Sequence, residues 1–226
     1  MAENLKEIQE RIQKALKNCG DVNRKVEIVA VTKVFGHTYI EKAIEAGICT
    51  IGENRVQEAE QKFRIIGKKV NWHLVGHLQR NKAKKAVSIF ELIHSVDSDK
   101  LANEIDKHAS EEGKIQNILV QVNTSFEDTK SGIEPEKAVD LALEMEKYNA
   151  LRMLGFMTIG PFTDEEKEVR KSFKMLKDIA EDFDRQADAD KRTKYLSMGM
   201  TSDYEIAVEE GSNMVRIGSA LFGARY

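Results

Sequence analysis

The chain has 226 residues, with 35 Lys and Arg against 38 Asp and Glu, and 41% of its residues are apolar. This near-neutral balance argues against a basic nucleic-acid-binding protein and against a disordered acidic one. No apolar run approaches the roughly 18 residues that cross a bilayer, and the N-terminal segment has the pattern of a charged amphipathic helix rather than a signal peptide. We therefore expect a globular cytoplasmic protein that binds neither nucleic acid nor membrane.

The metal-binding and redox residue types are sparse and scattered. Cys19 and Cys49 stand far apart and outside any Cys or His cluster, which disfavours a disulfide framework or a zinc site and predicts buried, reduced thiols. His73 and His77 are four residues apart, but they span a predicted strand end and a loop, so we expect no metal there and a hydrogen-bonding role for His73 inside the protein. The cation-rich stretch 80–85 is expected to be a solvated helix face.

Short runs rich in β-branched residues recur along the chain and predict eight strands. In chain order these runs cover residues 26–33, 48–52, 70–76, 91–97, 115–123, 151–158, 194–200 and 213–219. Apolar residues repeat at helical spacing between several of them, in stripes that begin at Val56, Leu101, Ala138 and Val169. Two S/T-x-x-E boxes, at Thr163 and at Ser202, predict the starts of two helices.

The alternation of strands and helices predicts the fold class. A strand-helix-strand crossover returns the chain in the same direction, so the eight strands should form a parallel sheet. A (β/α)8 barrel needs at least about 200 residues, which leaves only one extra N-terminal helix in this chain. We therefore predict an α/β protein with a single (β/α)8 TIM-type barrel domain over residues 1–226, and a doubly wound open sheet is the alternative. In a barrel, the active site lies at the carboxyl ends of the strands.

Two cationic side chains stand in or next to apolar strands. Lys33 ends the first predicted strand, in phase with Val29 and Val31. Loss of hydration there lowers the pKa of a lysine and leaves more of the free amine that condenses with an aldehyde, although a lysine that reaches water from a loop is the alternative. Arg216, in the last strand, needs a partner because arginine keeps its charge, either a core carboxylate or a ligand group.

Glycines and hydroxyl side chains follow the last two predicted strands, in the segments 197–203 and 216–223. Loops after the seventh and eighth strands of barrels commonly bind phosphate through backbone amides. Gly199, Gly218 and Ser219 would let the backbone approach such an anion closely, although glycines at these turns are also simple turn formers. The two segments therefore predict a phosphate-binding cradle.

Seven dispersed motifs, in order from about residue 26 to the end of the chain, resemble those of the pyridoxal phosphate homeostasis protein family, which are alanine-racemase-like barrels. They are AVTK (30–33), IGENRVQE (51–58), WHLVGHLQRNK (72–82), HSVDS (94–98), QVNTS with KSGI (121–133), LSMGM (196–200) and MVRIGSALFGAR (214–225). The resemblance implies the fold of the alanine racemase N-terminal domain and pyridoxal 5′-phosphate (PLP) as cofactor.

The resemblance also implies a role for individual residues. Lys33 would carry PLP as a Schiff base, Arg216 would face the pyridine nitrogen, and Asn54 and Met157 would border the ring. The phosphate would lie among Ser197, Met198, Gly199, Met200, Gly218 and Ser219. Two positions depart from the family pattern, because Val34 replaces a frequent threonine and Arg55 replaces a frequent aromatic residue, which we expect to change the rim of the pocket.

The expected site chemistry favours a carrier over an enzyme. A permanent cation at the pyridine nitrogen keeps that nitrogen unprotonated and makes PLP a poorer electron sink. Racemisation needs a second base, which the similar enzymes take from an additional β domain, and we expect no room for that domain after Gly223. We therefore predict a monomeric PLP carrier, without established turnover, that serves apo-enzymes as clients. The alternatives are a PLP-dependent amino-acid racemase and a class I aldolase that uses Lys33.

Overall fold

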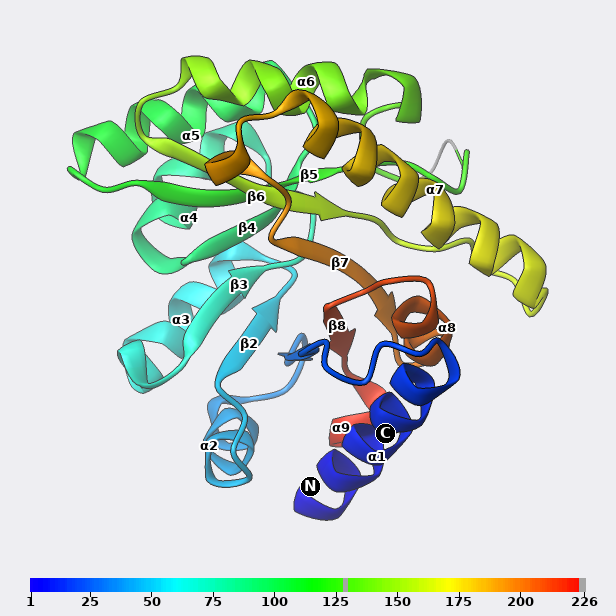
Figure 1. The fold of residues 1–226 in the computed structure, drawn as a ribbon. Coiled ribbons are helices and arrows are strands. Elements are labelled where there is room, and N and C mark those ends of the chain that lie inside the picture. Colours follow the sequence, from blue (N-terminus) through cyan, green and yellow to red (C-terminus); the bar gives the residue numbers. More distant parts are fainter. Residues whose placement is uncertain (128–129, 224–226) are drawn as a thin grey trace.

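The computed structural model describes residues 1–127 and 130–223 of the chain. Eight parallel strands close into a barrel in chain order, and a helix follows each strand (Figure 1). The predicted (β/α)8 barrel is confirmed, and the open-sheet alternative is wrong. The strands are β1 (Glu27–Val31), β2 (Thr50–Glu53), β3 (Asn71–Leu74), β4 (Leu92–Val96), β5 (Gln116–Gln121), β6 (Leu151–Met157), β7 (Tyr195–Met200) and β8 (Met214–Ile217).

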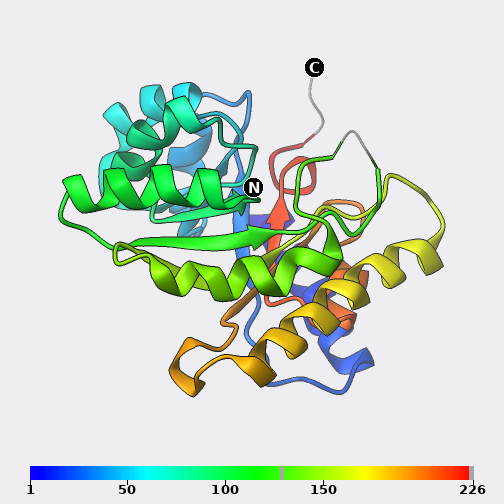
Figure 2. The ribbon, with the colours of Figure 1, turned by 90° about the horizontal axis from the view of Figure 1, so that it is seen from above.

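Helices surround the barrel, as the view from above shows (Figure 2). The α-helices are α1 (Ala2–Asn18), α2 (His37–Glu45), α3 (Val56–Ile66), α4 (Ala83–Ile89), α5 (Asp99–Glu111), α6 (Ala138–Glu144), α7 (Glu166–Gln186), α8 (Tyr204–Glu209) and α9 (Ser219–Phe222). Short 3-10 turns are η1 (Gly67–Lys69), η2 (Arg80–Lys82), η3 (Pro135–Lys137), η4 (Met145–Lys147) and η5 (Ala189–Lys191). Within the described residues, none of the helices combines the length and the apolar character that crossing a membrane requires.

Alternate residues of a strand face two different apolar cores. In β1, Val29 and Val31 belong to a small cluster that also contains residues of β4, β5, β6 and β8, so this cluster fills the interior of the barrel. Ala30 belongs instead to the large cluster between the strands and the helices. The sequence predicts Lys33 as the last residue of this strand, but β1 ends at Val31, and Lys33 lies two residues further on, in the turn that follows, with its side chain partly exposed.

The extra N-terminal helix takes the place of a full eighth barrel helix. The last helix, α9, has only four residues, and α1 packs beside it and against α8 (Figure 1). Arg11 forms an ion pair with Glu205, and the Asn18 side-chain amide donates to Glu209 Oε1 at 2.9 Å. These contacts fix α1 on the outer wall next to the two loops that follow β7 and β8.

The two predicted capping boxes are wrong. Helix α7 begins after Glu165, and Thr163 Oγ1 accepts the Glu165 N–H at 3.1 Å ahead of the helix. Helix α8 begins after Asp203 rather than Ser202, and the Asp203 carboxylate accepts the Met200 N–H at 2.5 Å. In both places the polar side chain stabilises the loop before the helix, so the helix starts one or two residues later than the sequence pattern predicts.

The cysteines also differ from expectation, because Cys19 and Cys49 are both exposed free thiols. Each stands at the edge of an element, Cys19 directly after α1 and Cys49 directly before β2, where the apolar core ends. The cation-rich stretch 80–85 is confirmed as a largely solvated face, with Arg80, Lys84 and Lys85 exposed on η2 and α4.

Candidate active site

A cavity of about 480 Å³ opens at the carboxyl ends of β1, β7 and β8. Six of the residues predicted for the site line it together, namely Lys33, Asn54, Met200, Arg216, Gly218 and Ser219. The cavity is completed by Val31, Val75, Ile159, Thr201 and Ser202, which are not among the predicted site residues. Barrel closure therefore brings the first strand's lysine next to the loops of the last two strands.

Four other predicted residues do not line this cavity. Met157 lies in the inner apolar cluster, and Met198 in the outer one, each with no exposed surface. Ser197 is also fully buried. Gly199 has φ +94°, and a Cβ there would lie 2.6 Å from Ala207 Cβ, so this glycine lets α8 pack onto β7. These four residues are therefore buried in the barrel and do not form part of the cavity lining.

Arg216 lines the cavity although it is only 4% exposed. Its Nη1 donates to the carbonyl oxygen and to Oγ of Ser197, and its Nη2 donates to the Thr158 carbonyl, all at 2.7 Å. Burial lowers the pKa of Arg216 to about 10, and the charge of Asp203 opposes this shift, so the guanidinium stays cationic at neutral pH. Among the described residues, neither a bonded carboxylate nor any partner for Nε is found, so the Nε–H remains available to a ligand.

Two histidines extend the Arg216 network into the barrel. His94 Nδ1 lies 3.0 Å from Ser197 Oγ, and His94 Nε2 lies 3.1 Å from His73 Nδ1. Because Arg216 donates to Ser197 Oγ, we assign the hydroxyl proton to the bond with His94 Nδ1, and the Nε2–H of His94 then donates to His73. The interior hydrogen-bonding role predicted for His73 is confirmed.

Both imidazoles in this network are neutral. Burial lowers the pKa of His73 to about 3, and burial, reinforced by the neighbouring ring and by Arg216, lowers the pKa of His94 well below its usual range. His94 is not among the residues predicted for the site, although a histidine inside the apolar run 91–97 was the available signal. The hydrogen bonds of this network, from Arg216 through Ser197 and His94 to His73, thus hold the buried cation through neutral groups.

The loops that follow β7 and β8 meet at Thr201. Its Oγ1 accepts long hydrogen bonds of 3.4 Å from the amides of Gly218 and Ala220. A Cβ at Gly218 would come no closer than 3.6 Å to any neighbour, the nearest being Val31, so little covers this part of the backbone. Backbone amides and hydroxyl groups converging on one cavity are the donors that a phosphate group requires.

These observations fit a phosphorylated aldehyde. A lysine, a buried cation with a free N–H and a set of phosphate donors line one cavity of suitable size.

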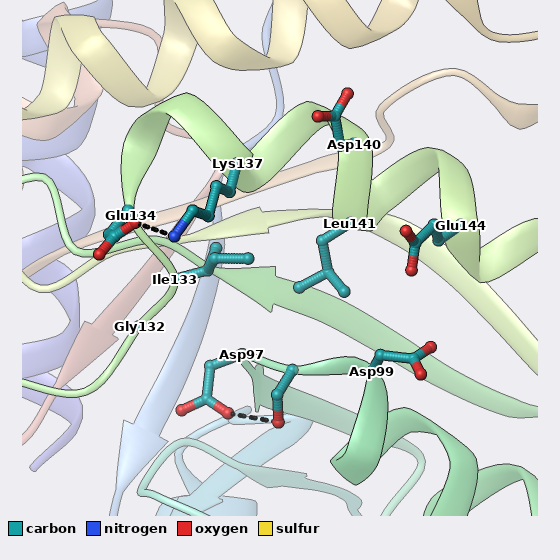
Figure 3. Close-up of a pocket in the computed structure, with 10 residues that line it drawn as sticks. Asp97, Asp99, Gly132, Ile133, Glu134, Lys137, Asp140, Leu141 and Glu144 are labelled. Atoms are coloured by element: carbon teal, nitrogen blue, oxygen red, sulfur yellow. Dashed lines mark hydrogen bonds and ion pairs between the residues drawn. The ribbon is translucent and has the colours of Figure 1, made fainter.

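A second, larger cavity of about 580 Å³ lies between α5 and α6 (Figure 3) and does not fit an anion, because most of its polar side chains are the carboxylates of Asp97, Asp99, Glu134, Asp140 and Glu144. Its lysine, Lys137, is paired with Glu134 at 2.5 Å. In the part of the chain that the structure describes, no group of three or more His, Cys, Asp or Glu residues is arranged for a metal ion.

Comparisons with known proteins agree with this geometry. The alanine racemase N-terminal domain family matches residues 3–226. The pyridoxal phosphate homeostasis protein of Aquifex aeolicus (strain VF5) is 36% identical over 224 residues, which cover 99% of this chain and 97% of the relative. The solved structure of PipY from Synechococcus elongatus PCC7942, with PLP bound, superposes with a TM-score of 0.85 at 33% identity, covering 98% of this chain and 99% of PipY.

A more distant solved structure shows the fold alone. Alanine racemase of Clostridium difficile 630 has a TM-score of 0.76 at 17% identity, and the match covers 96% of this chain but 57% of the racemase. The fold and the cavity thus define a barrel of the alanine racemase type. Within that class, the chain belongs to the pyridoxal phosphate homeostasis protein family.

Proposed function

We propose that this chain binds PLP on Lys33 and acts in PLP homeostasis as a carrier of the cofactor. The observation that carries the proposal is the single cavity that contains Lys33, Arg216 and the two loops after β7 and β8. When bound, PLP supplies an aldehyde that condenses with an amine, and a phosphate that anchors the molecule. The PLP-bound state of PipY and the homeostasis role named for the relatives support the proposal.

The polar residues of the cavity each have a role in this proposal. The Lys33 amine attaches the cofactor, and the free Nε–H of Arg216 faces the pyridine nitrogen. Asn54 borders the ring, and Met200 leads into the first of the two phosphate-binding loops. The phosphate is held by the backbone and hydroxyl donors of the two loops, which are contributed by Thr201, Ser202, Gly218 and Ser219.

The buried guanidinium disfavours transaminase-type chemistry and leaves racemisation or no turnover, and the second base that racemisation needs separates these two. Arg216 stays cationic at neutral pH, so a pyridine nitrogen beside it stays unprotonated and the ring is a poorer electron sink. The proposal includes a monomer in the cytoplasm that supplies apo-enzymes as clients. Size-exclusion chromatography with light scattering tests the monomer, and transfer of PLP to a purified apo-enzyme tests the client role.

The visible absorption spectrum and borohydride reduction, followed by peptide mass mapping, test the cofactor and its lysine together. We expect a yellow wild-type protein with a reduced pyridoxyl group on Lys33, and no label in Lys33→Ala. The matched control is Lys42→Ala, which removes an exposed lysine of α2 outside the cavity and should be labelled like the wild type. A colourless wild type that does not take up PLP would refute the proposal.

Turnover assays separate the remaining alternatives. Amino-acid racemase activity at enzyme-like rates that disappears in Lys33→Ala would replace the carrier by a racemase. Trapping of a sugar phosphate instead of PLP by borohydride would replace it by a class I aldolase. A labelled protein that lacks both activities and delivers PLP to an apo-enzyme agrees with the carrier.

A further inference from the structure

The backbone that presents Lys33 is strained. Residues 32–35 form a turn closed by a hydrogen bond of 3.0 Å from the Phe35 N–H to the Thr32 carbonyl. Val34 follows Lys33 in this turn with φ +66° and is 68% exposed. The left-handed conformation is strongly unfavourable for a β-branched residue. The Val34 side chain faces solvent, so burial of apolar surface does not offset this strain. Other interactions must therefore hold the turn in this shape.

A buried ion cluster lies directly behind the turn, on the outer side of β1 and β2. Its centre is Lys62 of α3, which is only 7% exposed. The Lys62 ammonium donates three hydrogen bonds of 2.7 Å, to Glu53 Oε1, to Glu58 Oε1 and to the Thr32 carbonyl. Glu53 has no exposed surface and also accepts the Thr32 hydroxyl. We refer to Glu53, Glu58 and Lys62 as the clamp.

The clamp forms hydrogen bonds with the residues on both sides of Lys33, Thr32 and Val34. On one side, Lys62 and Glu53 bind the carbonyl and the hydroxyl of Thr32. On the other side, Glu58 Oε1 accepts the backbone N–H of Val34 at 2.7 Å. Since a buried ammonium that loses its carboxylates is costly, the three charged groups hold one another in place and resist opening of the turn.

We propose that Glu53, Glu58 and Lys62 position Lys33 for the cofactor by locking the strained turn at residues 32–35 from behind the barrel wall. The inference rests on the proposed function, because it assigns the clamp to the presentation of the PLP-binding lysine. The clamp residues lie outside the residues that line the cavity, so they act through the backbone and not by contact with the ligand. A lysine held in one position releases its cofactor more slowly than a lysine on a mobile turn.

The matched pair Glu58→Ala and Glu60→Ala tests this proposal. Both glutamates lie on α3 and accept from a lysine at 2.7 Å, but Glu60 binds exposed Lys85 and does not reach the turn. The first readout is amide hydrogen exchange of Val34 in the cofactor-free protein, and the second is the rate of PLP release together with the absorption band of bound PLP. The conservative variant Glu58→Gln keeps an oxygen that can accept the Val34 N–H.

Glu58→Ala should raise both the Val34 amide exchange rate and the PLP release rate by about tenfold, since a charge-assisted hydrogen bond is lost. In Glu58→Gln both rates should return most of the way to their wild-type values. In Glu60→Ala both rates should equal those of the wild type. Equal rates in Glu58→Ala and wild type, or equal effects of both alanine variants, would overturn the clamp. Lys62→Met should raise both rates as Glu58→Ala does. If Lys62→Met does not fold, the comparison of Glu58→Ala with Glu60→Ala tests the clamp by itself. A wild type that takes up no PLP refutes the proposed function instead, whereas PLP uptake with unchanged release in Glu58→Ala refutes only the clamp.

Discussion

Acidification should destabilise the fold through the buried pair His73 and His94. Both imidazoles are neutral in the folded protein, with the pKa of His73 lowered to about 3 and that of His94 well below its ordinary 6.5. In the unfolded chain both rings bind protons as the pH falls through about 6.5, while the folded protein does not. The stability is therefore present above this pH and is lost progressively below it, down to the folded pKa.

The magnitude follows from proton linkage. A histidine that is free in the unfolded chain and cannot bind a proton when folded lowers the free energy of unfolding by about 2 kcal/mol between about pH 7 and about pH 5. The two rings together give about 4 kcal/mol. At about pH 5 the result does not depend on the exact folded pKa values, because burial keeps both imidazoles neutral in the folded protein.

Urea unfolding of the cofactor-free protein at the two pH values measures this loss. The single variants His73→Gln and His94→Gln should each lose about 2 kcal/mol less than the wild type over this pH range, since one linked proton is removed. The control is His77→Gln, which removes a half-exposed ring outside the buried pair. Carboxylates titrate equally in all four proteins, so they cancel in the comparison. The same pH dependence in the wild type and in both buried variants would refute the assignment of two neutral rings.

Two further substitutions probe the fold and the site. Gly155→Ala should lower the free energy of unfolding by about 3 kcal/mol or more in urea unfolding, because φ is +140° and a Cβ would lie 2.0 Å from the Tyr195 carbonyl oxygen. Gly113→Ala, with φ +65° and open space around it, should cost only about 1 kcal/mol, and equal losses would contradict the steric argument. Arg216→Met should weaken PLP binding in absorbance titrations by about tenfold or more, since a hydrogen bond to a charged group is lost, and unchanged affinity would exclude contact between this cation and the cofactor.

The sequence by itself determined the barrel. The eight apolar runs that predict β1 to β8 and the stripes of α3, α5, α6 and α7 arise from local periodicity, which depends only on neighbouring residues. The position of Lys33 close after β1 and of Arg216 in β8 could be read in the same way, and strand order in a barrel then predicts that they meet.

Only the tertiary structure decided what lies around these two cations. Ser197 bonds with Arg216 and His94 instead of lining the cavity, and Lys62 reaches across from α3 to the turn beside Lys33. These partners are separated by 19 to 103 residues for Ser197 and by 30 residues for Lys62 and Thr32. A sequence pattern reports which face of an element a residue occupies, whereas the partner of a buried polar group is set by barrel closure and by the need to satisfy every donor that loses water.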